Sequence, residues 1–387
     1  MRLALTIALA AGAAQAQTCG GPLPDFIAGV TAEAQAAGVS PETARAFFAG
    51  AAIDEAVLRA DRAQGVFQKD FIAFSRALIS QNRLDNGRIN ADRHAATFRT
   101  IQERFGIPPG VLLAFWAFET DYGQVQGDFN TRNALLTLAH DCRRPDLFRP
   151  QLIAAMELMA KGDFDPATTT GAWAGEIGQV QMLPRDILER GMDGDGDGHV
   201  RLKTSAADAL MSGANVLSAL GWRANEPWLQ EVRVPASLDW AMTGLNHTLS
   251  VAEWAARGVV AREGTLPAPD LPASVLLPMG RNGPAFLAYP NFSVYFEWNK
   301  SFVYVTTAAY FATRLSGASA YEPGNPSPAL TGEQMMTLQE KLIARGYDVG
   351  GVDGILGAQT RAAVQAEQTR LGLPADAWPT VDLLAAL

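Results

Sequence analysis

The chain has 387 residues, of which 48% are hydrophobic and 18% are charged, so it can bury one large core or two, and disorder is excluded as its dominant state. Lys and Arg number 31 against 40 Asp and Glu, and the net charge of -9 argues against nucleic acid as a partner. Two cysteines and four scattered histidines exclude a cysteine-based zinc cluster and offer little to a zinc enzyme. Any chemistry must therefore come from carboxylates, amides and aromatic side chains.

The first sixteen residues have the pattern of an export signal. A basic residue precedes the apolar run from Leu3 to Ala11, and Ala14-Gln15-Ala16 has the small residues that signal peptidase accepts. The run is too short for a permanent membrane helix, and no later apolar stretch reaches about eighteen residues. We therefore expect a soluble, periplasmic protein that begins at Gln17 and does not span a membrane. After export, Cys19 and Cys142 are expected to form one disulfide rather than remain two free thiols.

From Asp25 to about Gly317, apolar residues recur mostly at spacings of three and four, which predicts a mainly helical (α+β) domain. A helix is predicted from Val111 to Tyr122, because the preceding prolines suit a first helical turn. β-Branched and aromatic residues are enriched around 232–241 and 289–298, so we expect a small sheet or extended loops there.

The C-terminal part is predicted to be a separate module. Residues 17–320 form the main domain, and residues 321–329 read as a semi-rigid linker because they are rich in proline and lack apolar periodicity. Residues 330–387 follow as a small domain near the lower size limit for an independent core. Three helices are expected in this small domain. The first carries Met335, Leu338 and Leu342 on one face and ends at Gly346. The second ends at Leu371, and Thr380 caps the third.

Glu119 has the strongest case for chemistry. It lies one helical turn from the aromatic residues Phe115 and Tyr122. Poor solvation among aromatic rings raises the pKa of a carboxyl and keeps it protonated as a general acid near neutral pH. Asp121 points to another side of the predicted helix, so no second carboxylate accompanies Glu119 on its face. The alternative is a partly exposed glutamate without a role on a buried helix.

A glycine-rich segment, residues 171–184, brings polar side chains together with backbone that a ligand can approach closely. Gln179 and Gln181 each donate and accept hydrogen bonds, as sugar hydroxyls and acetamido groups require. Taken alone, the segment could equally be a surface turn.

Several linked motifs occur in the order and spacing of one family: FWAFETDYG (115–123), CRRPDLFR (142–149), GAWAGEIGQVQMLP (171–184), DGDGDGHV (193–200), GLNHTLSVAEWAARGV (244–259) and PNFSVYFEWNKSFVY (290–304). Over residues 23–316 the chain resembles the lytic murein transglycosylase B family, and residues 338–364 resemble the small three-helix peptidoglycan-binding domain. The resemblance implies a lysozyme-like core with a small β-containing subdomain, and a single catalytic glutamate at Glu119. It also implies cleavage of the MurNAc-GlcNAc β-1,4 bond with a 1,6-anhydro product.

The absence of a second carboxylate on the helical face of Glu119 fits such a reaction. A retaining glycosidase needs one about 5 to 5.5 Å away and an inverting one about 6.5 to 9.5 Å away. We expect Glu119 to protonate the leaving oxygen, the acetamido oxygen of the substrate to trap the anomeric carbon, and Glu119 to return as base to the C6 hydroxyl. Two alternatives remain open. They are a hydrolytic muramidase, with Glu176 as second carboxylate, and a catalytically idle peptidoglycan-binding scaffold.

The resemblance also implies that Gln181 binds the sugar at the cleavage point and that aromatic, amide and arginine side chains line the cleft. With the second glutamine of the glycine-rich segment, the expected substrate-binding residues are Gln179, Gln181, Arg143, Arg144, Phe292, Trp298, Asn299 and Tyr304. Arg143 and Arg144 could instead be a solvated pair, and Phe292 and Tyr304 could be core aromatics. Trp298 stands where the family usually has tyrosine, which keeps a stacking surface but loses a hydroxyl.

An Asp-rich loop is a candidate calcium site. Asp193, Asp195 and Asp197 match positions one, three and five of an EF-hand loop, but position twelve is Thr204 rather than Glu. Some members of the family close a longer loop with a later aspartate, here Asp208, and His199 completes the candidate set. The alternative is an Asp/Gly turn without metal. Calcium would be structural, because the chemistry at Glu119 requires no cofactor.

The expected partners are peptidoglycan glycan strands and stem peptides, with the small module raising the local enzyme concentration on the polymer. We expect a monomer, and the sequence identifies no protein partner. Glu367 falls where the module's family commonly has an aromatic core residue, which predicts weaker packing or an altered register.

Overall fold

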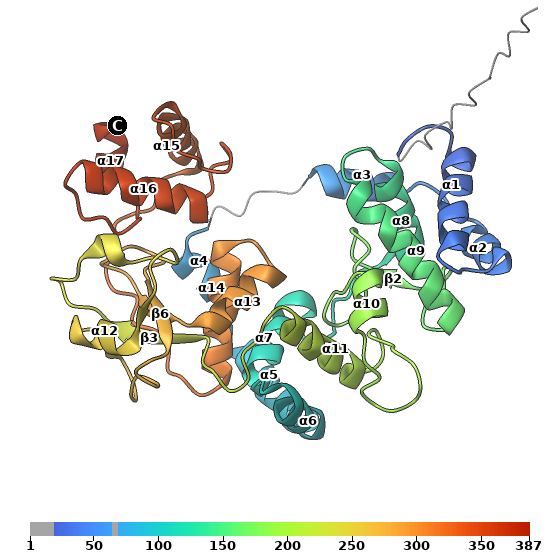
Figure 1. Ribbon diagram of the computed structural model, residues 1–387, viewed down its shortest axis with the longest axis horizontal. Helices are drawn as coiled ribbons and strands as arrows, with labels where there is room; N and C mark the ends of the chain where they lie inside the picture. The colour runs from blue at the N-terminus through green and yellow to red at the C-terminus, as the bar shows by residue number, and fades with distance from the viewer. Residues whose placement is uncertain (1–18, 64–68) are drawn as a thin grey trace, which may run out of the picture. The chain divides into compact units, whose positions relative to one another are not determined.

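The computed structural model describes residues 19–63 and 69–387 (Figure 1). The predicted signal segment, residues 1–16, and the expected mature N-terminus at Gln17 lie outside these ranges. The chain forms two compact units, each built from separate stretches: the first takes residues up to 62, 127–176 and 183–188, and the second takes 63–126, 177–182 and 189–387. No helix in the described ranges is both long and apolar enough to cross a membrane.

The first unit is helical with one short β-ladder. α8 packs against α9, α1 and α2 pack against α9, and β1 pairs antiparallel with β2. Arg132 of α8 is buried and donates to the carbonyl oxygens of Ala49 (2.7 Å) and Gly50 (3.0 Å), which ties the loop after α2 to α8. The elements are α1 (Leu23–Ala36), α2 (Pro41–Phe48), α3 (Glu55–Arg62), β1 (Phe129–Asn130), α8 (Thr131–His140), α9 (Pro145–Lys161), β2 (Thr170–Gly171) and α10 (Pro184–Arg190), whose last two residues belong to the second unit.

The expected disulfide is formed within the first unit. Cys19 and Cys142 have Cα atoms 5.2 Å apart and are separated by 123 positions in the chain. The bond ties the start of the described chain to the turn between α8 and α9.

The second unit surrounds α7 with helices. α7 packs against α5, α11 and α14, and its residues from Gly110 to Ala117 are all buried. A helix that is apolar on every side belongs in a core, which explains why the predicted helix at 111–122 is found there. The helices of this part are α4 (Phe71–Leu78), α5 (Gln81–Arg93), α6 (Ala95–Phe105), α7 (Pro109–Thr120), α11 (Ala206–Ala219), α13 (Pro290–Trp298) and α14 (Phe302–Leu315).

A five-stranded antiparallel sheet, ordered β4-β6-β7-β3-β5, forms a subdomain of the same unit. In its centre Val232 of β3 faces Ala285 of β7, and Leu287 of β7 faces Val275 of β6. Trp254 of α12 is fully buried against the sheet and donates its indole N–H to the carbonyl of Ala273 (2.8 Å). The elements are β3 (Leu229–Arg233), the 3-10 turn η1 (Trp240–Met242), β4 (Leu249–Ser250), α12 (Val251–Ala256), β5 (Val260–Ala261), β6 (Pro272–Leu276) and β7 (Ala285–Ala288).

The sequence placed the sheet only in part. The enrichment at 232–241 coincides with the end of β3, but residues 290–298 form helix α13, so the expectation of strand or extended loop there is wrong. Pro290 occupies the first helical turn, and Phe292, Tyr295 and Phe296 have the spacing of one helical face.

The C-terminal module has the three predicted helices, α15 (Gly332–Ala344), α16 (Ala358–Arg370) and α17 (Val381–Ala386), which are drawn in red tones in Figure 1. Thr380 caps the last by accepting a hydrogen bond from the backbone N–H of Leu383, and Gly346 follows the first in a left-handed conformation. Glu367 is 1% exposed and pairs at 2.7 Å with Arg370, whose side chain is 54% exposed, so an ion pair that reaches the surface occupies the place where an aromatic residue was expected.

Residues 321–329 contain no helix or strand, but they are attached to the second unit. Tyr321 packs on Phe71 (ring centroids 5.3 Å apart) and shares a 2.9 Å hydrogen bond with Ser75. The backbone N–H of Asn325 donates to the carbonyl of Asn282 (2.8 Å). The segment therefore runs along the unit rather than standing away from it.

Candidate active site

Glu119 lies half-buried at the C-terminal end of α7. Directly after this helix, Asp121, Tyr122 and Gly123 adopt φ values of 51°, 60° and 85°, and such left-handed backbone is costly for residues that carry a Cβ. Asp121 accepts a 3.0 Å ion pair from Arg83, and the hydroxyl of Tyr122 donates to the carbonyl of Arg83 (2.8 Å). These contacts hold the strained turn and so fix the end of the helix that carries Glu119.

Two aromatic donors converge on one oxygen of Glu119. The indole N–H of Trp298 donates to Oε1 at 3.0 Å, and the hydroxyl of Tyr304 donates to the same atom at 2.6 Å. No donor from the described ranges reaches Oε2. Oε1 is therefore held, and Oε2 is the oxygen that can carry a proton toward a ligand.

The surroundings of Glu119 favour its protonated form. Burial raises the pKa of Glu119, and the hydrogen bonds from Tyr304 and Trp298 lower this pKa only in part. Burial beside Glu119 also raises the pKa of Tyr304 well above its ordinary value, so its hydroxyl remains a donor. A buried carboxyl with a raised pKa has the property required of a general acid near neutral pH.

Aromatic rings surround this carboxyl. Phe115 contacts Trp298 (ring centroids 4.5 Å apart) and stacks on Tyr295 (4.9 Å), while Phe118 meets Tyr304 edge-on at 5.8 Å. The sequence predicted that Trp298 keeps stacking but loses a hydroxyl. Its indole N–H supplies a donor to Glu119, so the position retains hydrogen bonding.

The acidic residues that lie beside Glu119 and Trp298 in the sequence already have basic partners. Asp121 bonds to Arg83, and Glu297 of α13 bonds to Lys300 at 2.8 Å. Glu176, the second carboxylate of the hydrolytic alternative, belongs to the first unit. Within the second unit, the side chains that bond to Glu119 are an indole and a phenol, those of Trp298 and Tyr304.

The two glutamines of the glycine-rich segment differ in placement. Gln179 is 7% exposed, its side chain donates to the carbonyl of Lys203 (3.4 Å), and its own carbonyl accepts from Thr120 (2.6 Å). Gln181 is half-buried with φ at 53°, and its side-chain amide donates to the carbonyl of Gly178 (2.8 Å). Gln179 therefore anchors the loop against the end of α7, and Gln181 is the more exposed of the two glutamines.

Other expected substrate-binding residues divide between core and surface. Phe292 is 1% exposed and belongs to the core, so it is not available to a sugar. Asn299, half-buried after α13, accepts a 2.9 Å hydrogen bond from the backbone N–H of Ser301 and shapes the turn into α14. Tyr304 binds Glu119 directly, which the sequence alone did not indicate.

Arg143 and Arg144 lie in the first unit and share a buried partner. Both form ion pairs with Asp61, which is 1% exposed, and Arg143 also donates to its carbonyl oxygen (2.7 Å). They are therefore more than a solvated pair, since they neutralise a buried carboxylate. Their side chains nevertheless remain 47% and 34% exposed.

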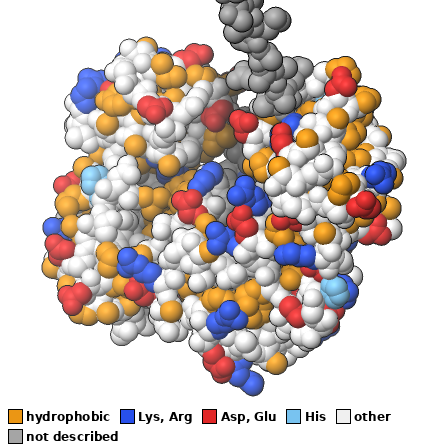
Figure 2. Space-filling view, turned by 45° about the vertical axis from the view of Figure 1, so that its right-hand side comes forward, with side chains coloured by type: hydrophobic (Ala, Val, Ile, Leu, Met, Phe, Trp, Pro, Cys, Tyr) orange, Lys and Arg blue, Asp and Glu red, His pale blue; other side chains and the backbone are white. Residues whose placement is uncertain are grey.

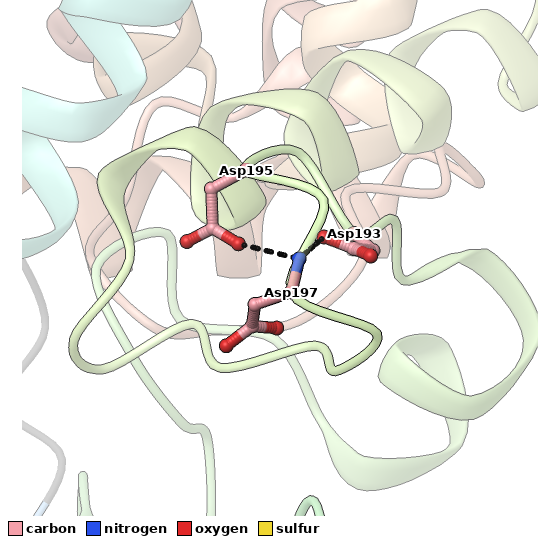
Figure 3. A group of neighbouring side chains, drawn as sticks. All are labelled: Asp193, Asp195 and Asp197. Carbon is pink, nitrogen blue, oxygen red and sulfur yellow. Dashed lines mark hydrogen bonds between the residues drawn. The ribbon is translucent and has the colours of Figure 1, made fainter.

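The Asp-rich loop gathers three carboxylates (Figure 3). Asp193, Asp195 and Asp197 are exposed and bring carboxylate oxygens within 4.8 Å of one another, and the backbone N–H of Asp197 bonds to the other two (3.2 and 3.3 Å). Arg201 also pairs with Asp197 at 2.6 Å. This set fits a hard cation in charge and donor type.

Asp208 does not fit the expected set of metal ligands. It is fully buried, and its two carboxylate oxygens accept from the backbone N–H groups of Gly194 (2.8 Å) and Arg201 (2.7 Å). It closes the loop through backbone hydrogen bonds. On the face drawn in Figure 2, acidic and basic side chains are interspersed over the described residues.

Comparison with known proteins places the chain among enzymes of one kind. A family model of the transglycosylase SLT domain matches residues 23–313, and a model of a peptidoglycan binding domain matches residues 331–387. Membrane-bound lytic murein transglycosylase B of Escherichia coli (strain K12) is 27% identical over 153 residues, which are 39% of this chain and 42% of that protein. The chain thus matches less than half the length of this relative.

Solved structures are similar over most of the chain. The crystal structure of SltB3 from Pseudomonas aeruginosa in complex with NAG-anhNAM-pentapeptide is 35% identical, covers 95% of this chain and 99% of that chain, and has a TM-score of 0.86. The Escherichia coli lytic transglycosylase Slt35 in complex with calcium is 22% identical, covers 79% of this chain and 97% of that chain, and has a TM-score of 0.64, which is a likeness of fold.

Proposed function

Because this chain belongs to the lytic transglycosylase family of the SLT domain, we propose that it is an exported periplasmic enzyme that cleaves the MurNAc-GlcNAc β-1,4 bond of peptidoglycan and leaves a 1,6-anhydroMurNAc end. The family match over 23–313, the peptidoglycan-binding match over 331–387 and a relative solved with an anhydro-sugar peptide support this proposal. The observation that carries it is the carboxyl of Glu119, held at Oε1 by Trp298 and Tyr304 in a half-buried setting.

The first step is acid catalysis by Glu119. Its Oε2 gives a proton to the glycosidic oxygen as the bond from C1 to that oxygen breaks, and the carbonyl oxygen of the substrate's acetamido group bonds to C1. The carboxylate that forms is stabilised at Oε1 by the N–H of Trp298 and the hydroxyl of Tyr304. The sugar's own amide thus replaces the second carboxylate of a retaining glycosidase.

The second step reverses the role of Glu119. The C6 hydroxyl of the same sugar attacks C1, the bond from C1 to the acetamido oxygen breaks, and Oε2 of Glu119 takes the hydroxyl proton. Glu119 returns to its protonated form, and water is not consumed. Glu119 therefore serves as both acid and base, because the proton that it gives in the first step is replaced by the proton that it takes in the second.

The substrate contacts follow from exposure. Gln181 and Asn299 supply amide groups to the sugar, and Arg143 and Arg144 offer their exposed guanidinium surface to the glycan. Gln179 acts by positioning the loop, and Phe292 by packing. The C-terminal module adds a second contact to peptidoglycan, which raises the local enzyme concentration.

Analysis of fragments released from purified sacculi tests this proposal. We expect 1,6-anhydro ends in the released muropeptides and no incorporation of isotope-labelled water at the cleaved bond. Reducing ends carrying the label would instead identify a hydrolytic muramidase. Binding without released fragments would identify a scaffold without catalysis.

Calcium has a structural role in this proposal. The carboxylates of Asp193, Asp195 and Asp197 would hold it, and Asp208 would support the loop through Gly194 and Arg201. We expect calcium titrated into EDTA-treated protein to bind with measurable heat and raise the melting temperature while fragment release is unchanged. Asp195→Asn with Asp197→Asn should abolish the heat. Absence of heat with the unaltered protein at millimolar calcium would reject the site.

A further inference from the structure

The C-terminal module belongs to the second unit and packs against the rest of it. Trp378 is 5% exposed within the same core that contains Phe302, and its indole N–H donates to the carbonyl of Ser327 (3.0 Å). The side-chain amide of Gln365 donates to the carbonyls of Trp240 (3.1 Å) and Thr243 (2.9 Å). These polar contacts have defined partners on both sides, which a loosely tethered domain lacks.

Arg361 of α16 is at the centre of this packing. It is 9% exposed, and its guanidinium donates to the carbonyl oxygens of Pro278 (2.6 Å) and Leu277 (3.4 Å). The same group lies over the ring of Phe302, 4.3 Å from its centroid, and 5.7 Å from the ring centroid of Trp378. A buried cation held by carbonyls and aromatic faces loses these contacts in any other position.

Phe302 connects this contact to the candidate acid. It is the first residue of α14, and Tyr304, whose hydroxyl bonds to Glu119 at 2.6 Å, lies in the same first turn. Ser301 caps this turn by accepting from the backbone N–H of Tyr304 (3.4 Å). Val303 lines a hollow together with module residues such as Leu356, so the module covers part of the turn whose tyrosine binds Glu119.

We propose that the docked module is a structural part of the catalytic centre, and that Arg361 is a positioning residue that holds the first turn of α14 where Tyr304 donates to Glu119. The inference deepens the proposed function, because it rests on Glu119 as the acid and base. Arg361 itself contacts neither the substrate nor Glu119. It acts through Phe302 and Tyr304.

Loss of Arg361 is expected to change the pKa of Glu119 and kcat in defined directions. Without the guanidinium, two carbonyls and the face of Phe302 lose their partner, and the first turn of α14 loosens. The hydrogen bond from Tyr304 lowers the pKa of Glu119, so its weakening raises this pKa further. Glu119 must be protonated in the first step, so activity then persists to higher pH, and kcat falls because the carboxylate formed in that step is less stabilised.

Four full-length variants, assayed on soluble glycan strands, test this inference. They are Arg361→Met, Arg361→Lys, Tyr304→Phe and the Arg361→Met/Tyr304→Phe double variant. We expect Arg361→Met to lower kcat about 10-fold with little change in KM, as for lost transition-state stabilisation, and to move the basic limb of the pH profile upward, as Tyr304→Phe does. Adding Arg361→Met to Tyr304→Phe should cause no further shift. Arg361→Lys should restore part of kcat, and Arg345→Met, at an exposed position of the same module, should match the unaltered enzyme.

Additive effects in the double variant, or an unchanged kcat and pH profile in folded Arg361→Met, would overturn the inference. If Arg361→Met does not fold, Gln365→Leu loosens the same docking at its other contact and is expected to shift the limb in the same direction. Hydrogen exchange of the amides at 304–306 gives a readout independent of turnover. Faster exchange is expected in Arg361→Met, and unchanged exchange would contradict the positioning role. A lack of fragment release by the unaltered enzyme is a different outcome, and it would refute the proposed function itself. The exchange measurement remains informative in that case, because it does not depend on turnover.

Discussion

Replacing Glu119 with Gln is expected to abolish fragment release from purified sacculi, with a loss at or above the upper end of the 10²–10⁴-fold range that general acid-base catalysis contributes. The loss is large because one carboxyl gives the proton in the first step and takes it in the second. The amide of Gln still accepts hydrogen bonds from Trp298 and Tyr304, so the site should keep its shape while losing the transferable proton. Release of soluble muropeptides over time measures the effect.

Glu297→Gln is the matched control, since Glu297 is an exposed acid on α13 that pairs with Lys300. It should retain activity. Burial raises the pKa of Glu119, so ionisation of this group costs folding stability once the pH rises above its ordinary pKa. Glu119→Gln should therefore gain melting temperature relative to the unaltered protein at neutral pH, and less at acid pH. Turnover by Glu119→Gln near that of Glu297→Gln would remove Glu119 from the mechanism.

Removal of the Cys19–Cys142 disulfide is expected to lower the free energy of unfolding of the first unit by about 2 to 5 kcal/mol. The two cysteines are 123 positions apart, so the bond closes a long loop and restricts the unfolded chain strongly. Denaturant unfolding with and without a reducing agent measures the loss. Cys142→Ser combined with Cys19→Ser should show the lower midpoint in both conditions.

Unfolding of the reduced protein can contradict this prediction. If its unfolding midpoint equals that of the oxidised protein, the bond contributes no stability. A loss in the reduced protein that is absent from the double serine variant would instead point to reaction of the freed thiols, since serine removes both the bond and the thiols. The two measurements together separate these causes.

The sequence predicts best what depends on neighbours along the chain. The helix that carries Glu119, the capping by Thr380 and the helices of the module follow from periodicity and caps, and the resemblance names the family. The aromatic residues near Glu119 indicate a poorly solvated carboxyl, and burial in the structure has this effect. These features need no knowledge of distant contacts.

Features that depend on distant segments were predicted less well. Trp298 and Tyr304 lie 179 and 185 positions from Glu119, and no local pattern shows that both reach the same oxygen. Composition at 289–298 indicated strand or loop because aromatic residues suit both sheets and buried helices. The contacts of Arg361 with the ring of Phe302 and the carbonyl of Pro278 could not be predicted from the sequence either, because a basic residue on a predicted helix normally faces solvent.

The order in which the chain supplies its two units has a consequence for synthesis. The first unit is complete once residue 188 has been made, although the chain has by then already passed through part of the second. α7, buried along most of its length, receives α14, one of its three packing partners, only when residues 302–315 emerge. A nascent chain halted between these points would combine a finished N-terminal fold with an apolar helix that is still exposed on one side. Chaperones bind species of this kind, which otherwise aggregate.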